Sequence, residues 1–347
     1  MKVLMKAVKK LNKGKGVEIT TAAIPEPGPG EVLIRVKVAG ICGTDLHIFK
    51  WDEWSQKRIK PPVIIGHEFV GEIVQVGFGV NHLRAGQRVS AEGHITCGRC
   101  KYCRNGQGHI CQDVKLIGVD INGCFAEYIC IPAVNVWPVH DDIPDKYAAI
   151  FDPLGNAMHA VMVEPVSMKN VLIIGAGSIG LFAIPIAKAN GAGKIIVIDP
   201  NPMKRDIALK VGADLALDPE DSDLKDKVIS VTGKNGPDRL LEMSGSSSAL
   251  CVGLDLLGNG GSVSLLGIPP NNISINLAEK VIFKGITLHG ITGRRMYETW
   301  YQCESFLLNH GNLIDPIITH CIDIEDIENG FRWMEANEAV KVLLKII

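Results

Sequence analysis

The 347-residue sequence has no block of charge of one sign. Its 36 lysines and arginines nearly balance 38 aspartates and glutamates, which leaves a formal net charge of -2. Proteins that hold nucleic acid or an anionic membrane surface by electrostatics present a clustered basic patch instead. We therefore expect a small-molecule substrate as partner, with no nucleic acid and no membrane.

The sequence also lacks an export signal and an uninterrupted membrane span. Residues 1–6 contain no apolar core and no cleavage pattern, so we expect a cytoplasmic location. Residues 171–192 are apolar with a single lysine, but four glycines and a proline interrupt them. A buried strand followed by a tight turn and a helix explains this run better than a transmembrane helix.

No internal repeat or low-complexity segment is present. With 46% hydrophobic and 21% charged residues, the chain can bury a large core, and its length favours two domains.

The ten cysteines are the most informative residue type. A cytoplasmic chain keeps its thiols reduced, which favours metal ligation over disulfides. Four of them form a Cx2Cx2Cx7C run: Cys97, Cys100, Cys103 and Cys111. Four thiolates close the tetrahedral shell of a zinc ion and leave no open position, so the run predicts a structural zinc. An iron–sulfur cluster, whose cysteines are spaced differently, and a pair of disulfides are the alternatives. Five further cysteines are expected to be packing thiols: Cys124, Cys130, Cys251, Cys303 and Cys321.

A second group offers three different ligand types. Cys42 lies in a Gly-Ile-Cys-Gly-Thr-Asp segment, and His67 and Glu68 follow Gly66 further along the chain. A thiolate, an imidazole and a carboxylate can hold zinc with its fourth position open, which is typical of a catalytic metal. Such a metal acts as a Lewis acid on an alcohol, and the deprotonated alcohol can release a hydride.

Three nearby polar residues are candidates for catalytic proton transfer. Thr44 and His47 follow Cys42 by two and five residues, and they suit a relay that carries the alcohol proton to solvent. Alternatively, Thr44 caps a helix that begins there and His47 packs on that helix. Asp152 is a candidate for a carboxylate close to the metal, and it is also a candidate helix N-cap.

The pattern of apolar residues changes along the chain. Up to about residue 155, short β-type runs such as 32–38, 69–74 and 125–129 predict a mostly antiparallel, barrel-like domain. From residue 156, strands and helices alternate and predict an α/β doubly wound parallel sheet. The expected strands are 171–174, 194–198, 238–243 and 262–266, and the expected helices are 178–190, 203–211 and 249–257.

A glycine motif follows the first of these parallel strands. Gly175, Gly177 and Gly180 form a GxGxxG sequence that opens a helix, where backbone N–H groups favour a pyrophosphate. Asp199 ends the next strand, and a carboxylate there accepts hydrogen bonds from a ribose diol and repels a 2′-phosphate. This favours NAD over NADP, although Lys204 and Arg205 are candidates for the adenosine end or for solvated helix charges.

These motifs together resemble the zinc-dependent medium-chain dehydrogenase family over essentially the whole chain. The resemblance implies a GroES-like catalytic domain at 1–155 with both zinc sites, a Rossmann NAD-binding domain at 156–294 and a return to the catalytic domain at 295–347. Within the family the chain resembles the bacterial L-threonine 3-dehydrogenases through these segments: 51–57, 92–98, 152–157, 266–270, 298–301 and 316–320.

The resemblance also implies residue roles. It assigns zinc to Cys42, His67 and Glu68, a relay to Thr44 and His47, and a relay carboxylate to Asp152. NAD contacts are implied at Ile179, Asp199, Lys204, Leu266, Gly267, Ile268, Ile291 and Thr292. The Lys204 and Thr292 positions depart from the residues that the family often carries. Family members are commonly homotetramers.

The reaction implied is oxidation of the 3-hydroxyl of L-threonine by NAD⁺ to 2-amino-3-oxobutanoate. The residues that hold the substrate's ammonium and carboxylate are not evident, and Glu53, His94 and Arg294 are the candidates. Two other functions remain open: a polyol or vicinal-diol dehydrogenase on the same scaffold, and a non-catalytic binding protein that keeps the fold.

Overall fold

The computed structural model describes residues 3–347, which form two compact units. In unit 1 the described residues up to Asp152 join Arg295–Leu308 and Ile318–Ile347, and unit 2 comprises Pro153–Arg294 with Asn309–Ile317. Across residues 3–347, no helix combines the length and the apolar character needed to cross a bilayer.

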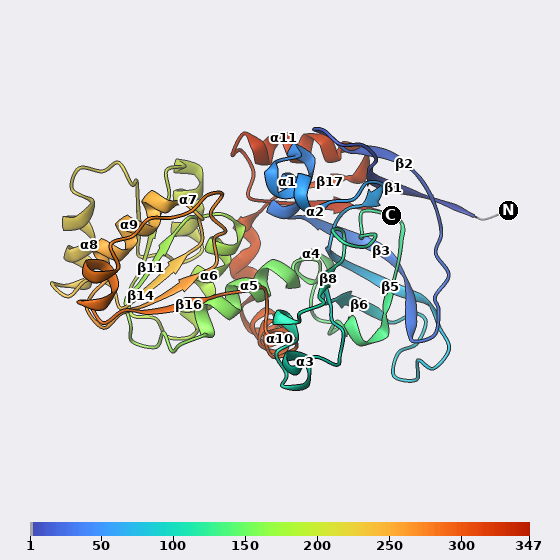
Figure 1. The fold of residues 1–347 in the computed structure, drawn as a ribbon, viewed down its shortest axis with the longest axis horizontal. Helices are drawn as coiled ribbons and strands as arrows, with labels where there is room; N and C mark the ends of the chain where they lie inside the picture. Colours follow the sequence, from blue (N-terminus) through green and yellow to red (C-terminus); the bar gives the residue numbers. More distant parts are fainter. Residues whose placement is uncertain (1–2) are drawn as a thin grey trace. The chain divides into compact units, whose positions relative to one another are not determined.

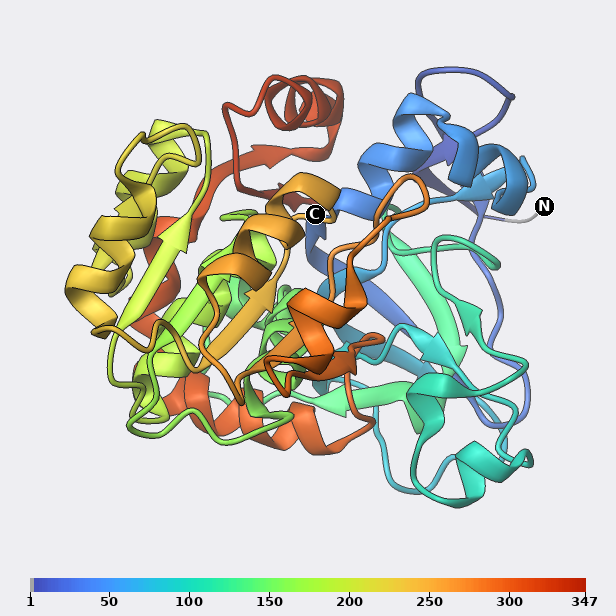
Figure 2. The same cartoon turned by 60° about the vertical axis from the view of Figure 1, so that its left-hand side comes forward.

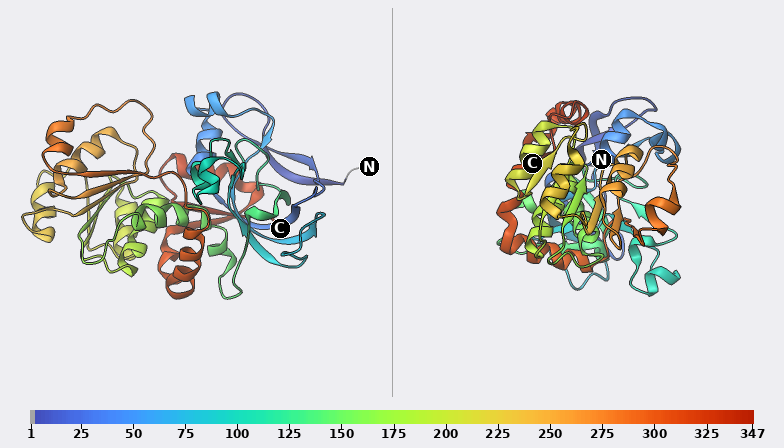
Figure 3. Two further views of the ribbon diagram at one scale, coloured as in Figure 1. Left: turned by 60° about the horizontal axis from the view of Figure 1, so that its bottom comes forward. Right: turned by 90° about the vertical axis from the view of Figure 1, so that its left-hand side faces the viewer.

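Unit 2 is built on a six-stranded parallel sheet of order β13-β12-β11-β14-β15-β16. Its strands are β11 (Val171–Ile174), β12 (Ile195–Ile198), β13 (Leu215–Leu217), β14 (Arg239–Glu242), β15 (Ser262–Leu265) and β16 (Thr287–Gly290). The order reverses between β11 and β14, which is the arrangement of a Rossmann fold. Figure 1 labels strands of this sheet, and the left view of Figure 3 shows helices on both of its faces.

Two helices of unit 2, α7 and α9, begin at a side-chain cap. Asn201 accepts a hydrogen bond from the Lys204 N–H at the start of α7, and Ser246 accepts one from the Ala249 N–H at the start of α9. The helices are most of α5 (Phe151–Met162), α6 (Ser178–Ala189), α7 (Pro202–Lys210), α8 (Leu224–Thr232) and α9 (Ser247–Leu256), with a short π-helix η3 (Ala278–Ile282) and a 3-10 helix η4 (Gly311–Ile317). The predicted alternation of strands and helices is confirmed, with ends shifted by two residues at most.

Unit 1 contains a larger, mainly antiparallel sheet of order β10-β6-β5-β3-β18-β17, with β9 also paired to β3. Its strands are β3 (Glu31–Ile41), β5 (Glu68–Val76), β6 (Arg88–Ala91), β9 (Tyr128–Pro132), β10 (Val136–Pro138), β17 (Ile318–Asp323) and β18 (Lys341–Lys345). Smaller sheets join β1 (Leu4–Lys10), β2 (Glu18–Ala23) and β4 (Val63–Ile64), and β7 (His94–Ile95) with β8 (Lys115–Leu116).

The expected strands in this half of the chain are largely present. Residues 32–38 and 69–74 lie within β3 and β5, but the strand expected at 125–129 begins only at Tyr128. Phe125 is fully buried and Ala126 makes one isolated bridge with Ala7, so this stretch packs into the core before regular pairing starts.

Most helices of unit 1 are short. They are α1 (Gly43–Lys50), α2 (Glu53–Arg58), α3 (Lys101–Arg104), α4 (Asp145–Ala148) and α11 (Ile327–Glu335), together with most of α10 (Glu298–His310). Phe49 of α1 stacks on Phe331 of α11 with ring centroids 4.6 Å apart. Both rings belong to the core of the unit, so this contact anchors α1, whose N-cap is Cys42. Figure 1 shows α1 and α11 near each other.

Candidate active site and metal centres

The structure brings Cys42, His67 and Glu68 together, as the sequence predicts. Cys42 follows the end of β3 and is the N-cap of α1, while His67 and Glu68 stand at the start of the neighbouring strand β5. One ligand atom from each residue lies within 4.8 Å of the others. A sulfur, an imidazole nitrogen and a carboxylate oxygen at such separations match the donor set of a zinc site with one open position.

A buried carboxylate that sequence reasoning missed lies behind these ligands. Asp45 is fully buried, and its carboxylate accepts hydrogen bonds from the backbone N–H of Cys42 at 2.9 Å and of Gly66 at 3.2 Å. Its Oδ1 lies 3.7 Å from Nδ1 of His67. Asp45 therefore ties together the two segments that supply the ligands, and an acidic residue three positions after Cys42 is the only sequence signal for it.

The electrostatics of this group fit a cation. Burial would lower the pKa of His67, but the negative charges of Asp45 and Cys42 outweigh it and raise that pKa well above its ordinary value. Burial raises the pKa of Asp45. His67 Nδ1 is also buried without a hydrogen-bond partner. A divalent ion bound here would offset the repulsion among these closely spaced, buried negative groups.

Glu68 has a second unforeseen neighbour in Lys341, the first residue of β18. Both side chains are buried, and they form an ion pair. Nothing in the local sequence around Lys341 indicates this contact, because the two residues are 273 positions apart.

The predicted relay residues Thr44 and His47 both lie on α1. The hydroxyl oxygen of Thr44 is 3.8 Å from Cys42 Sγ, which places it beside the metal group. The alternative roles for these residues are wrong. Cys42 rather than Thr44 is the N-cap, and the His47 side chain is 59% exposed instead of packed on the helix.

Asp152 is buried at the second position of α5, so its expectation as an N-cap is also wrong. Its negative charge is among those that raise the pKa of His67, after the burial that lowers it and the larger effects of Asp45 and Cys42. The Asp152 carboxylate therefore acts electrostatically on one of the three metal-ligand candidates, His67.

The four-cysteine run forms a compact cluster in a lobe of unit 1, drawn in teal in Figure 2. Cys100 Sγ lies 3.5 Å from Cys103 Sγ and 3.9 Å from Cys111 Sγ, and Cys97 Sγ lies 4.0 Å from Cys103 Sγ. Four thiolates at 2.3 Å from a tetrahedral zinc are separated by about 3.8 Å. All ten cysteines are free, so the disulfide alternative is wrong.

Backbone N–H groups support the thiolates of this cluster. The N–H groups of Cys103 and Gln112 lower the pKa of Cys100 to about 6, whereas desolvation raises the pKa of Cys103 to about 11. The lobe thus holds its sulfurs at metal-binding distances. Of the cysteines outside the two groups, Cys124 and Cys303 are buried as expected, but Cys321 is exposed and is not a packing thiol.

In unit 2 the glycine motif adopts the geometry that a dinucleotide site needs. Gly175 has a positive φ of 93°, which favours glycine. A side-chain carbon at Gly180 would lie 2.0 Å from the Gly175 carbonyl oxygen, so the third glycine permits the helix to approach the strand. At Gly177 such a carbon would meet nothing within 4 Å, and this open space at the N-terminus of α6 fits a pyrophosphate.

Asp199 stands beyond the end of β12 next to this loop. It is buried, and its carboxylate accepts hydrogen bonds from the N–H of Ala176 at 2.7 Å and of Asn201 at 2.8 Å. Arg205 is not a solvated charge, because its guanidinium donates to the carbonyls of Asp199 and Pro200 and to Asp218 Oδ2. Arg205 therefore supports the Asp199 turn.

The remaining predicted cofactor residues lie at the same edge of the sheet. Ile179 is in the first turn of α6 and Lys204 in that of α7, while the other positions come directly after β15 and β16: Leu266, Gly267, Ile268, Ile291 and Thr292. The backbone N–H groups of Leu266 and Gly267 donate to the Glu242 carbonyl at the end of β14. The carboxyl ends of the parallel strands thus gather all of these positions, where ligands bind in open α/β sheets.

The three candidates for substrate recognition differ in their surroundings. Glu53 is exposed and bonded to Lys57 on α2. The His94 ring and backbone N–H are both held by Glu92 Oε1, at 2.7 and 2.9 Å. Arg294 is buried, with Nη1 3.4 Å from Asn156 Oδ1.

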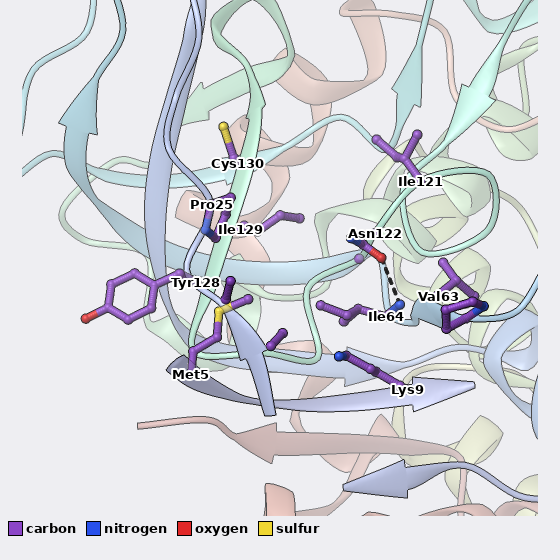
Figure 4. A pocket seen from close by; sticks show the side chains of 14 residues that line it. Met5, Lys9, Pro25, Val63, Ile64, Ile121, Asn122, Tyr128, Ile129 and Cys130 are labelled. Carbon is purple, nitrogen blue, oxygen red and sulfur yellow. Dashed lines mark hydrogen bonds between the residues drawn. The ribbon is translucent and has the colours of Figure 1, made fainter. Parts of the chain in front are cut away.

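A cavity of about 520 Å³ opens elsewhere in unit 1, between β1, β2, β9 and residues 121–123. Figure 4 shows its largely apolar lining, with Ile64 N–H bonded to Asn122 Oδ1. It contains none of the predicted ligand or relay residues, so the metal group rather than this cavity defines the candidate active site.

Comparison with known proteins agrees with both units. Residues 28–141 match the family described as alcohol dehydrogenase GroES-like domain, and residues 178–309 match zinc-binding dehydrogenase. Among solved structures, an alcohol dehydrogenase from Thermotoga maritima has a TM-score of 0.90 and 28% identity, with 99% of each chain covered. A zinc-binding dehydrogenase from Sinorhizobium meliloti bound to NADP and an Escherichia coli alcohol dehydrogenase complexed with NADH each have a TM-score of 0.89, 28% identity and 99% coverage of both chains.

The curated relatives are more similar still. L-threonine 3-dehydrogenase from Pyrococcus horikoshii is 47% identical over 344 residues, with 99% of each chain covered. L-threonine 3-dehydrogenase from Caldanaerobacter subterraneus is 45% identical over 343 residues, 98% of this chain and 99% of that one. The fold and the two metal-ligand groups define an alcohol-oxidising dehydrogenase, and the chain belongs to the zinc-binding dehydrogenases with a GroES-like domain.

Proposed function

We propose that this protein is an L-threonine 3-dehydrogenase, which oxidises the 3-hydroxyl of L-threonine with NAD⁺ and yields 2-amino-3-oxobutanoate and NADH. The observation that carries the proposal is the 47% identity over 99% of both chains to an enzyme of that name. Conversion of the alcohol to the ketone removes a hydride and a proton, so the protein needs a hydride acceptor and a route for the proton.

The proposed division of labour follows the two units. Residues 1–155 and 295–347 form the catalytic domain, and residues 156–294 form the NAD-binding domain. Cys42, His67 and Glu68 hold the catalytic zinc, and the four-cysteine lobe holds a structural zinc, because the donor atoms of each group lie at zinc-binding separations. When bound, the catalytic zinc supplies Lewis-acid polarisation of the substrate hydroxyl, and NAD⁺ accepts the hydride.

The protein's own residues orient the reactants and move the proton. Thr44 stands beside Cys42 and receives the hydroxyl proton, and His47 passes it to solvent from its exposed position on α1. Asp152 adds a carboxylate near the metal group. The Asp199 carboxylate selects a free ribose diol and therefore NAD⁺ over NADP⁺. We further propose a cytoplasmic homotetramer that acts in threonine breakdown toward glycine.

The test is NADH formation from purified protein with L-threonine and NAD⁺, with and without a chelator, beside sorbitol and butane-2,3-diol. The highest kcat/KM for L-threonine, lost on chelation and recovered with zinc, supports the proposal. A higher kcat/KM for either diol identifies a diol or polyol dehydrogenase, and no NADH from any alcohol with zinc fully loaded indicates a binding protein.

A further inference from the structure

The turn between α1 and α2 folds Asp52 back onto His47. Trp51 ends α1 with a left-handed φ of 58°, and its N–H donates to the His47 carbonyl at 3.0 Å. The chain reverses there, and Asp52 becomes the N-cap of α2. Two residues that are five positions apart are thereby brought into side-chain contact.

The two oxygens of the Asp52 carboxylate have separate partners. Oδ1 accepts hydrogen bonds from the backbone N–H and the hydroxyl of Ser55, each at 3.0 Å, which fixes the carboxylate on the end of α2. Oδ2 is hydrogen-bonded to Nδ1 of His47. The helix cap therefore holds the carboxylate in one orientation and leaves one oxygen for the imidazole.

We propose that Asp52 is a positioning residue for proton transfer: it holds the His47 ring with Nδ1 protonated and so leaves Nε2 as the nitrogen that accepts the substrate's proton. This inference rests on the proposed function, in which His47 belongs to the relay. Asp52 is not a metal ligand and is not next to a ligand in the sequence. The metal group alone therefore gives Asp52 no role in the reaction.

The protonation state of Asp52 determines the tautomer of the ring. Partial burial would raise the pKa of Asp52, but the N–H of Ser55, the His47 ring and the Ser55 hydroxyl lower it below its ordinary value. The carboxylate is therefore ionised near neutral pH and can only accept hydrogen bonds. The proton between the two groups belongs to Nδ1, and Nε2 carries the free lone pair.

An exposed imidazole needs such an anchor. The His47 side chain is 59% exposed. Besides its bond to Asp52, the His47 ring makes an edge-type contact with the ring of Trp54, with centroids 6.2 Å apart and planes at 61°. A proton taken up at Nε2 converts the ring to imidazolium, whose charge Asp52 offsets, and the same proton then leaves from Nε2 to water. The step is balanced without any further reactant.

The test variant is Asp52→Asn. Asparagine is as good an N-cap as aspartate, so α2 is expected to stay folded, but its amide group can donate to Nδ1 and favour the opposite tautomer. Glu335→Gln is the control, because it removes a partly exposed carboxylate that is bonded to Lys15 and not to His47. We expect kcat with L-threonine to fall roughly tenfold to a hundredfold in Asp52→Asn and to stay unchanged in Glu335→Gln.

Two readouts separate positioning from a structural effect. The ¹⁵N NMR signals of the His47 ring, assigned with His47→Gln, should show a protonated Nδ1 in the wild type and a protonated Nε2 in Asp52→Asn. In kinetics, adding Asp52→Asn to His47→Gln should cause no further loss of kcat. The inference is overturned if the His47 tautomer is unchanged in Asp52→Asn. It is also overturned if the loss of kcat in the double variant equals the product of the losses in the two single variants.

The NMR measurement needs no substrate, so it distinguishes this inference from the proposed function. If the wild type forms no NADH from L-threonine, the proposed function fails while the tautomer is still measured. If the wild type is active and its His47 ring is protonated at Nε2 only, the proposed function stands and the positioning role of Asp52 is rejected.

Discussion

Lys341 Nζ lies 2.8 Å from Glu68 Oε2 and 3.0 Å from Oε1, and the two side chains meet across the strand that separates them. Lys341 is on β18 and Glu68 on β5, on opposite sides of β3. The crossing point is Gly40 of β3, where a side-chain carbon would lie 2.3 Å from Glu68 Oε2. The absence of a side chain at Gly40 therefore gives the metal-ligating carboxylate access to its cationic partner.

Replacing Lys341 with methionine should destabilise the protein strongly. The substitution keeps most of the volume but leaves the Glu68 carboxylate buried without its cation, and breaking a buried pair in this way costs on the order of 3 kcal/mol or more. Thermal unfolding of the chelated protein is the measurement, with Lys345→Met on the exposed end of the same strand as control. An equal midpoint for the two variants would show that the pair does not stabilise the fold.

Gly177→Ala and Gly180→Ala should separate cofactor binding from folding. A methyl group at Gly177 meets no protein atom within 4 Å, so stability should hold while the Kd for NAD⁺ rises about tenfold or more, because the methyl enters the space for the pyrophosphate. At Gly180 the methyl would collide with the Gly175 carbonyl, so this variant should lose stability as well. Calorimetric titration with NAD⁺ and thermal unfolding measure the two effects, and the expectation fails if Gly177→Ala binds NAD⁺ like the wild type.

Substitutions in the two cysteine-containing groups should each remove one zinc with different consequences. Cys42→Ser should leave about one zinc per chain in a folded protein without dehydrogenase activity, since only the group beside Thr44 is affected. Cys100→Ser should also leave about one zinc but lower the unfolding midpoint, because a structural zinc contributes on the order of 10 kcal/mol to folding. Elemental analysis with thermal unfolding tests both, and full activity in zinc-loaded Cys42→Ser would contradict the assignment of the catalytic metal.

Glu164 should make unit 2 sensitive to acid. Partial burial would raise the pKa of Glu164, but hydrogen bonds from His289 and Ser262 and the charge of Arg239 lower it below its ordinary value. A depressed carboxyl pKa stabilises the folded state fully above the unfolded value, about 4.3, and this contribution is lost as pH falls through the folded value.

In Glu164→Gln we therefore expect lower stability at pH 7 and a smaller further loss between pH 5 and pH 3 than in the wild type. Thermal midpoints across this range check the expectation, with the exposed Glu298→Gln as control. If the plots of thermal midpoint against pH are parallel for the wild type and Glu164→Gln, the Glu164 carboxyl has the same pKa in the folded and unfolded states.

Local patterns were sufficient to predict much of this architecture. Between residues 171 and 266 each predicted strand or helix begins within two residues of its expected place, whereas β13 and α8 were not predicted. Both metal groups could be predicted because their ligands stand in recognisable local sequences: four cysteines within fifteen residues in one group, and Cys42 with the adjacent pair His67 and Glu68 beside glycines in the other. The glycine motif and Asp199 were recognised for the same reason, since the first two parallel strands carry them at their carboxyl ends.

Contacts between distant segments could not be predicted in this way. Asp45 looks like an ordinary acidic residue in the first turn of a helix, and only the fold places it beneath His67. Lys341 lies 273 positions from Glu68, so no spacing rule connects them. The helix-cap roles considered for Thr44 and Asp152 were wrong because each helix begins earlier than the cap residue's chemistry suggested.

The pairing of β18 with β3 has a consequence for biosynthesis. Lys341 emerges from the ribosome after the whole of unit 2. The Glu68 carboxylate therefore has no ion-pair partner while some 270 further residues are synthesised. A nascent chain that has already collapsed its N-terminal strands still exposes the edge of β3, and such an unpaired edge favours aggregation until β18 is made.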